Sequence, residues 1–140
     1  MASKKRSRIS RQDPENGKLI KAVESGKTSS DSQKPLFCFE HMVSGYDINE
    51  CERNEKAQIL SALYTRSRMS WSELRTAPRH GLGYEKIART SINPTVPEVI
   101  TEDVDIIAFR CIGLAPMIGY KDGNIFRIVW IDREFKVYDH

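Results

Sequence analysis

Three stretches decide the fold: Val-Asp-Ile-Ile-Ala-Phe-Arg-Cys-Ile at residues 104–112, Met-Ile-Gly-Tyr at 117–120, and Ile-Phe-Arg-Ile-Val-Trp-Ile at 125–131. Each is short, rich in β-branched and aromatic residues, and bounded by turn-forming residues, which is typical of β-strands. Asp122-Gly123 lies between the second and third stretches and predicts a tight hairpin. The end of the chain is therefore expected to form an antiparallel meander.

The third stretch also predicts which side chains are buried. Phe126, Ile128 and Trp130 alternate with Arg127 and Val129, so the first three are expected to share the core face of the strand. Asp132-Arg133-Glu134 predicts a turn, and a last short strand is expected over residues 135–138.

The residues before the meander predict one further strand and two helices. Leu36 to Met42 is a compact apolar run, which is interpreted as the first strand. A helix is expected from about residue 50 to residue 68, capped by Asp47 or Asn49. Its predicted inner face comprises Ala57, Ile59, Leu60, Leu63 and Tyr64.

Ser70-Trp71-Ser72-Glu73 has the pattern of a capping box and predicts a second, short helix that ends before Pro78. The two glycines of residues 79–87 predict an irregular loop. Residues 91–102, with Pro94 and Pro97, are expected to be extended. The order β-α-α-β-β-β-β predicts an α+β fold, in which two helices pack on one face of a small, mostly antiparallel sheet.

Charge divides the chain of 140 residues into two parts. Residues 1–35 hold nine Lys and Arg against four Asp and Glu, whereas residues 36–140 hold 13 against 15. The first part is poor in apolar residues and predicts a flexible basic arm. A single α+β domain is expected over residues 36–140.

The composition also indicates where the protein works. No stretch approaches the roughly 20 apolar residues of a membrane span, and the basic start lacks the apolar segment of a secretory signal. Cys38, Cys51 and Cys111 are odd in number and widely spaced, so we expect reduced thiols, with Cys38 and Cys111 in the core. These features predict a cytoplasmic protein.

The meander resembles the RelE/ParE superfamily of bacterial toxins. The residues that carry the resemblance are Phe109-Arg110, Ile118-Gly119-Tyr120, Phe126 to Asp132, and Val137 to His140. In that superfamily a strand ending in a basic residue leads to a hairpin of the type Arg-hydrophobic-hydrophobic-acidic, which Arg127 and Asp132 match. The final strand often carries a His, Tyr or Arg, which Tyr138 and His140 match. The first helices are basic in that superfamily, whereas the corresponding helices expected here are less basic. The segment 79–84 is not part of the pattern of the superfamily.

The resemblance implies a toxin-like endoribonuclease or RNA-binding domain of a toxin–antitoxin system, acting on RNA without a metal ion or other cofactor, with an antitoxin-like protein as partner. Cleavage by the RNA 2′-hydroxyl needs a base, an acid and cations for the charged phosphorane. His and Arg suit these roles, and aromatic rings can stack on an unpaired base. The candidate catalytic residues are Arg79, His80, Arg110, Arg127, Tyr138 and His140.

Further residues are candidates for RNA binding: Lys4, Lys5, Arg6 and Arg8 of the arm, and Tyr84, Lys86 and Lys121. No pair of His or Cys has the spacing of metal ligands, and no metal site is predicted. Two alternatives stay open. The chain could be a non-catalytic module whose basic arm binds nucleic acid or a protein, or a protein-binding accessory factor of a phage or mobile element.

Overall fold

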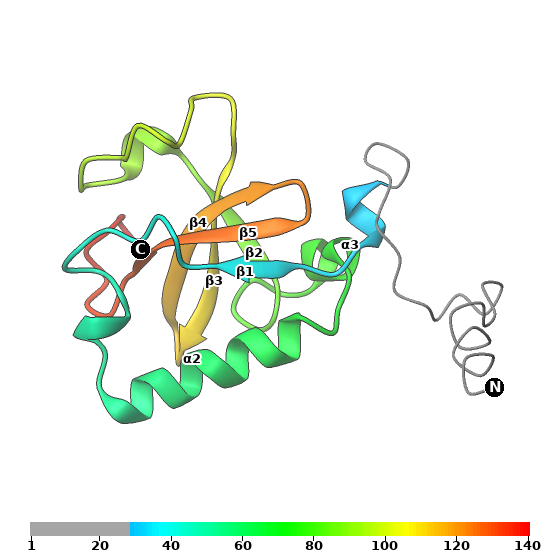
Figure 1. Cartoon of the computed structure of the whole chain (residues 1–140), viewed down its shortest axis with the longest axis horizontal. Coiled ribbons are helices and arrows are strands. Elements are labelled where there is room, and N and C mark those ends of the chain that lie inside the picture. Colours follow the sequence, from blue (N-terminus) through cyan, green and yellow to red (C-terminus); the bar gives the residue numbers. More distant parts are fainter. Residues whose placement is uncertain (1–28) are drawn as a thin grey trace, which may run out of the picture.

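The computed structural model describes residues 29–140, and within them the strands form one five-stranded sheet (Figure 1). The strands are β1 (Leu36–Cys38), β2 (Tyr84–Ile87), β3 (Ile106–Ile112), β4 (Ala115–Asp122) and β5 (Ile125–Ile131). Their spatial order is β1-β5-β4-β3-β2, with β1 parallel to β5 and the other neighbours antiparallel. The predicted α+β fold and mostly antiparallel sheet are confirmed.

Two α-helices follow β1, namely α2 (Arg53–Arg66) and α3 (Trp71–Thr76). Single-turn 3-10 helices occur at Ser30–Ser32 (η2), Ile48–Glu50 (η3) and Arg89–Ser91 (η4). The predicted capping box of α3 is present, with the Glu73 amide donating to Ser70 Oγ and the Ser70 amide donating to Glu73. Asp47 caps η3 instead of α2, which begins at an equivalent box between Glu52 and Glu55. No helix of residues 29–140 is both long and apolar enough to cross a membrane.

The sheet has a core on each face. On one face, α2 and α3 pack Ile59, Trp71 and Leu74 against Phe109 and Phe126. On the other face, the segment between β2 and β3 and the residues after β5 cover the sheet. That second core contains Ile92, Ile100, Ile106, Tyr120, Trp130, Val137 and Tyr138. Figure 1 shows α2 running below the sheet and the segment that follows β2 extending above it.

A bulge in β5 corrects the predicted face of Trp130. Ile118 pairs with Trp130 but the next residue, Gly119, pairs with Ile128, so Val129 is the extra residue. Phe126 and Ile128 therefore face the helices, whereas Trp130 lies in the opposite core. Alternation fails here because a bulge inserts one residue and shifts every later side chain to the other face.

The predicted inner face of α2 is also wrong in part. Leu60 and Tyr64 are 69% and 61% exposed. The inward row instead contains Ile59, Leu63 and Arg66, at spacings of four and three that place them on one side of a helix. The pattern missed this row because a buried arginine occupies one of its positions.

The last predicted strand, residues 135–138, is wrong. The amides of Lys136 and Val137 donate to the side chain of Asp132, at 2.7 and 3.0 Å, and the Val137 carbonyl accepts from the Asn93 amide at 2.7 Å. Phe135 has a φ of 59°. The backbone is thus satisfied by a side chain and a loop, and the segment folds back over the sheet without joining it.

Two other strand boundaries differ from the prediction. β1 ends at Cys38, because a turn in which the Met42 amide donates to the Phe39 carbonyl follows it. β2 lies inside the predicted irregular loop. There only residues 78–83 are irregular, with the amides of Gly81 and Gly83 both donating to the Pro78 carbonyl.

Residues 29–35, predicted as part of the arm, pack on the domain where the structure describes them. The Trp71 amide donates to the Gln33 carbonyl at 3.0 Å, and Pro35 is buried. Arg75 of α3 pairs with Asp31 at 3.0 Å. Cys111 and Cys51 are buried, whereas Cys38 is only half-buried.

Candidate functional site

A cluster of polar side chains lies where β2, β3 and the residues after β5 meet. Glu85 of β2 pairs with Ala108, two residues before Arg110 on β3. Because residues two apart share a face of a strand, Glu85 and Arg110 point to the same side of the sheet. Arg110 Nη2 donates to Glu85 Oε2 at 2.8 Å, and the arginine side chain is only 9% exposed.

Two further groups bind the same carboxylate. Arg79, in the loop before β2, donates from Nη1 to Glu85 Oε1 at 2.9 Å and remains largely exposed. The Tyr138 hydroxyl donates to Glu85 Oε2 at 3.1 Å and accepts from Arg110 Nη1 at 3.4 Å. Burial raises the pKa of Tyr138 to about 12, with the Glu85 charge adding to the effect against Arg110. Tyr138 is therefore a neutral phenol that can donate a hydrogen bond at physiological pH.

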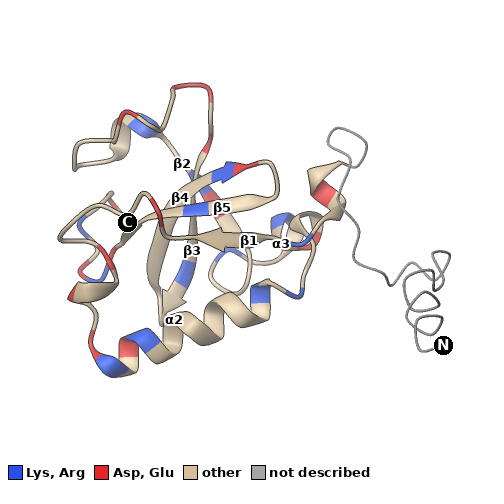
Figure 2. Ribbon diagram, viewed as in Figure 1, with Lys and Arg blue, Asp and Glu red and all other residues tan. Residues whose placement is uncertain are grey.

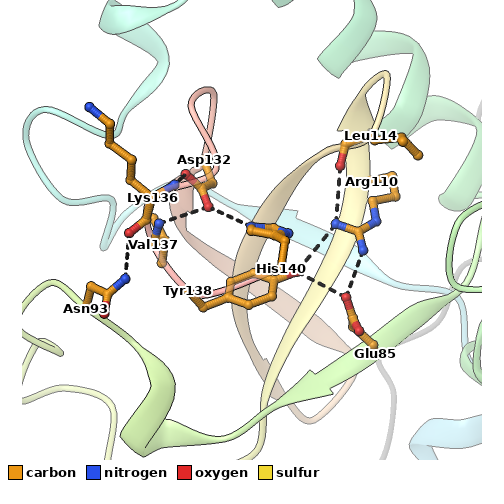
Figure 3. Close-up of polar contacts among 9 residues, drawn as sticks. All are labelled: Glu85, Asn93, Arg110, Leu114, Asp132, Lys136, Val137, Tyr138 and His140. Carbon is orange, nitrogen blue, oxygen red and sulfur yellow. Dashed lines mark hydrogen bonds and ion pairs between the residues drawn. The ribbon is translucent and has the colours of Figure 1, made fainter.

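His140 continues the row of contacts. Its ring lies against that of Tyr138, with centroids 4.0 Å apart, and its Nε2 is 3.3 Å from Asp132 Oδ2. Asp132 is 1% exposed and also accepts two backbone amides. In Figure 3 the contacts form a continuous row from Asp132 through His140 and Tyr138 to Arg110 and Glu85. The buried carboxylate contacts Nε2 of His140, whereas Nδ1 makes no hydrogen bond within residues 29–140.

We call the residues Arg79, Glu85, Arg110, Asp132, Tyr138 and His140 the Glu85 cluster. Four of its members were predicted from the sequence: Arg79, Arg110, Tyr138 and His140. Glu85 and Asp132 were not predicted as site residues. No paired carboxylates stand out in the sequence, because these two lie 47 positions apart and only the fold-back of residues 132–140 brings both to one site.

His80 lies next to the cluster, at a groove with a cavity volume of about 480 Å³. The groove lies between α2 and the loop of residues 78–83, and Arg110, Cys111 and Gly113 at the end of β3 also line it. Its main lining side chains are Gln58, Ser61, Thr65, His80, Leu82 and Arg110.

Arg66 fixes the loop that carries His80. Its Nε donates to the Leu82 carbonyl at 2.9 Å, its Nη2 to the Gly81 carbonyl at 3.0 Å, and its Nη1 to the Ala62 carbonyl at 3.2 Å. The guanidinium lies 5.1 Å from the centre of the Phe109 ring. Burial lowers the pKa of Arg66, and no carboxylate pairs with it among residues 29–140. A buried cation satisfied by carbonyls ties the helix to the loop.

The structure does not bring Arg127 to the cluster. Arg127 pairs with Tyr120 of β4, whereas Arg110 pairs with Pro116, four residues along that strand. That separation is about 13 Å along the strand. Arg127 instead binds Asp122 at 2.9 Å and Glu40 at 3.4 Å, and the Asp122 bond is the main reason that its pKa is raised.

The other predicted RNA-binding residues are spread over the molecule. Tyr84 packs against Trp71 and Phe109 in the helix-side core, and burial raises its pKa. Lys86 pairs with the exposed Asp105 at 3.3 Å. Lys121 donates to Ser30 and lies over the Trp71 ring. Figure 2 shows Lys and Arg distributed over several elements of the domain. The arm residues Lys4, Lys5, Arg6 and Arg8 lie outside the described residues.

Comparison of the chain with protein family models, curated proteins and solved structures finds no match of any of the three kinds. Within residues 29–140, no three His, Cys, Asp or Glu side chains are placed so that they could hold a metal ion.

Proposed function

We propose that the Glu85 cluster is the active site of an endoribonuclease that cleaves single-stranded RNA with its own side chains. The observation that carries the proposal is the contact of the Glu85 carboxylate with two guanidinium groups and the Tyr138 phenol. The imidazole of His140 lies against the Tyr138 ring. These are the groups that transfer of a phosphoryl group to the RNA 2′-hydroxyl requires.

Glu85 is the proposed general base. All three of its contacts are hydrogen-bond donors, so its oxygens act as acceptors. It would take the proton from the 2′-hydroxyl, whose oxygen then attacks the adjacent phosphorus. His140 is the proposed general acid and would give a proton from Nδ1 to the departing 5′-oxygen. The products are a 2′,3′-cyclic phosphate and a 5′-hydroxyl end.

Arg79 and Arg110 are the proposed stabilisers of the phosphorane. Arginine matches phosphate oxygens with two donors, and its charge does not depend on pH in the working range. Arg79 is well exposed and can approach the phosphate. Arg110 is largely buried, so its charge acts in a site partly shielded from water, where electrostatic interactions are stronger.

The test is cleavage of a 5′-labelled single-stranded RNA by the wild type, Glu85→Gln and His140→Ala. Each variant is expected to lose about 100-fold or more in rate. Glu98→Gln, an exposed carboxylate in the segment after β2, is the matched control and should keep the wild-type rate. Mass spectrometry should identify the cyclic phosphate. Absence of cleavage by the wild type, or equal rates for wild type and Glu85→Gln, would refute the proposal.

The resemblance to the toxin superfamily adds a readout in cells. Induction of the wild type in a bacterial host is expected to arrest growth and degrade RNA, and Glu85→Gln should relieve both effects. Growth arrest by both proteins would show that the toxicity has another origin.

A second candidate, RNA binding without cleavage, is favoured by the charge of residues 1–35, with nine Lys and Arg against four Asp and Glu. Binding through such a segment depends steeply on salt. Deletion of residues 1–28 preserves the part that packs on the domain, and on this hypothesis it should remove most of the salt dependence. Unchanged binding by the truncated protein would exclude the arm as the binding element.

A further inference from the structure

The groove beside the Glu85 cluster has a different chemical character from the cluster itself. One wall is α2, where residues 57–65 carry no charged side chain. Figure 2 shows the charges of α2 confined to its two ends. The opposite wall is the loop with His80 and Leu82, and Arg66 and Arg110 also line the groove. The groove therefore offers a neutral helix surface, an exposed imidazole ring and two arginines.

We infer that this groove binds one unpaired nucleobase of the RNA whose phosphate lies at the Glu85 cluster. This inference rests on the proposed function, since it assigns to the same site a base-binding part. The volume of about 480 Å³ is within the range of small-molecule pockets, and a purine is smaller than the ligands typical of that range.

The side chains of the helix wall suit the edge of a base. Gln58 has two donors and an acceptor, and the Ser61 and Thr65 hydroxyls each donate and accept. The three lie three and four residues apart along α2, so they share one side of the helix. Each is exposed. Neutral donors and acceptors at fixed spacing recognise a base edge, whereas a phosphate would need cations along this wall.

The loop wall suits the face of a base. His80 is exposed and Leu82 is 37% exposed, and bases stack on His rings and on guanidinium planes. Arg66 binds the Gly81 and Leu82 carbonyls within this wall, so the wall keeps its place without ligand. A preformed wall lowers the entropy cost of binding.

The groove shares Arg110 with the cluster, and this continuity favours RNA over a protein segment. Arg110 lines the groove, and its guanidinium binds Glu85 on the face of the sheet opposite α2, so a ligand that occupies both places carries a phosphate and a base on the two sides of one residue. A nucleotide has that arrangement. An acidic peptide would satisfy Arg110, but it would leave Gln58, Ser61 and Thr65 without a specific role.

The test measures binding alone, with probes that cannot be cleaved. The probes are a six-nucleotide 2′-O-methyl oligoadenylate, the oligouridylate of the same length, and an abasic 2′-O-methyl strand of the same length. Dissociation constants are measured by fluorescence anisotropy for the wild type. The ratio of the abasic value to that of the better-binding base-containing strand is expected to be about five- to 150-fold.

Ser61→Trp fills the groove from the helix wall, and Leu60→Trp places the same side chain on the adjacent exposed position of α2. Ser61→Trp should reduce the ratio to about threefold or less, whereas Leu60→Trp should preserve it. Thr65→Trp is a second groove variant in case Ser61→Trp does not fold, which circular dichroism would show. An unchanged ratio in folded Ser61→Trp and Thr65→Trp would overturn the inference.

The outcomes separate this inference from the proposed cleavage. Glu85→Gln should keep the base-dependent ratio even though it loses cleavage. If the wild type cleaves no RNA but its base-dependent ratio is reduced by the groove variants, only the proposed nuclease activity is refuted. If the wild type cleaves RNA but the groove variants leave the base-dependent ratio unchanged, only the base site is refuted. The base site is also refuted if no probe binds and a protein partner occupies the groove instead.

Discussion

Arg110 Nη2 and Glu85 Oε2 lie 2.8 Å apart on the face of the sheet opposite α2, and neither side chain is more than 18% exposed. A pair this buried depends on both partners, because removal of one leaves the other charge poorly solvated. The same carboxylate binds Arg79 from the exposed side. The pair therefore supports the fold as well as the proposed chemistry.

Arg110→Met is expected to lower the free energy of unfolding by about 2–3 kcal/mol. This loss is at or below the lower end of the cost of breaking a buried ion pair, because Arg79 still binds Glu85. Urea denaturation followed by circular dichroism measures this loss. The double variant Arg110→Met with Glu85→Gln should recover part of it, since the unpaired charge is then absent. A double variant less stable than the sum of the two single losses would contradict this account.

Arg66→Leu is expected to destabilise the protein by about 2–3 kcal/mol, since two loop carbonyls and one helix carbonyl lose a charged donor. The loop of residues 78–83 should also lose protection in hydrogen exchange followed by mass spectrometry. Arg68→Leu, two residues along the chain and bound to the exposed Tyr64, is the control and should change stability by about 0.5 kcal/mol or less. Equal loop protection in both variants would show that Arg66 does not hold the loop.

Gly119→Ala is expected to prevent folding or to cost several kcal/mol. A Cβ at this position would lie 1.9 Å from the Arg127 carbonyl oxygen, across the bulge, and backbone cannot yield that far. Gly113→Ala has open space but a φ of 58°, so it should cost only about 1–2 kcal/mol. Thermal unfolding of the two variants gives the comparison, and similar melting temperatures would argue against a close approach at Gly119.

Tyr138 predicts a loss of stability at high pH. Its pKa is raised from 10.0 to about 12 in the folded protein, so the folded state disfavours the phenolate. The stability that Tyr138 contributes as a neutral phenol is fully present below about pH 10 and is lost as the pH rises toward 12. A pKa difference of two units between the folded and unfolded states corresponds to about 3 kcal/mol of folding free energy. The stability of the wild type relative to Tyr138→Phe should fall over that interval. A constant difference from pH 9 to 11.5 would indicate that Tyr138 titrates normally.

The three cysteines should differ in their rate of alkylation. Burial raises the pKa of Cys111 to about 12 and also raises that of Cys51, so both thiols stay protonated at pH 8, and the thiolate is the reactive form. Half-buried Cys38 is expected to react first with iodoacetamide. Peptide mapping by mass spectrometry checks the order, and modification of Cys111 before Cys38 in folded protein would contradict it.

The sequence predicted the parts of the fold that depend on local pattern. The strand at 125–131, the hairpin at Asp122-Gly123 and the capping box at Ser70 each involve residues close in the chain, and each is present. The expected strand at 135–138 failed because its apolar pattern could not show that Asp132 takes the amides a neighbouring strand would have taken.

The candidate site was predictable only in part, for a related reason. Arg79, Arg110, Tyr138 and His140 have the residue types that RNA chemistry needs, and the structure places them together. Glu85 gave no signal, because two of its three partners, Arg110 and Tyr138, come from distant segments. The burial of Arg66 was not predicted, since carbonyl acceptors leave no pattern in a sequence.

The parallel pairing of β1 with β5 determines the order in which the sheet can assemble. Arg127 and Cys38 are in contact but 89 positions apart, whereas β4 and β5 are joined by a tight turn. Closure of the longer loop carries the larger entropy cost and slows folding. The β3-β4-β5 meander is therefore expected to form first, and β1 to dock late on a sheet edge that stays open in the meantime. During synthesis β1 leaves the ribosome first but finds its partner strand last, so this edge is where premature pairing with another chain would begin.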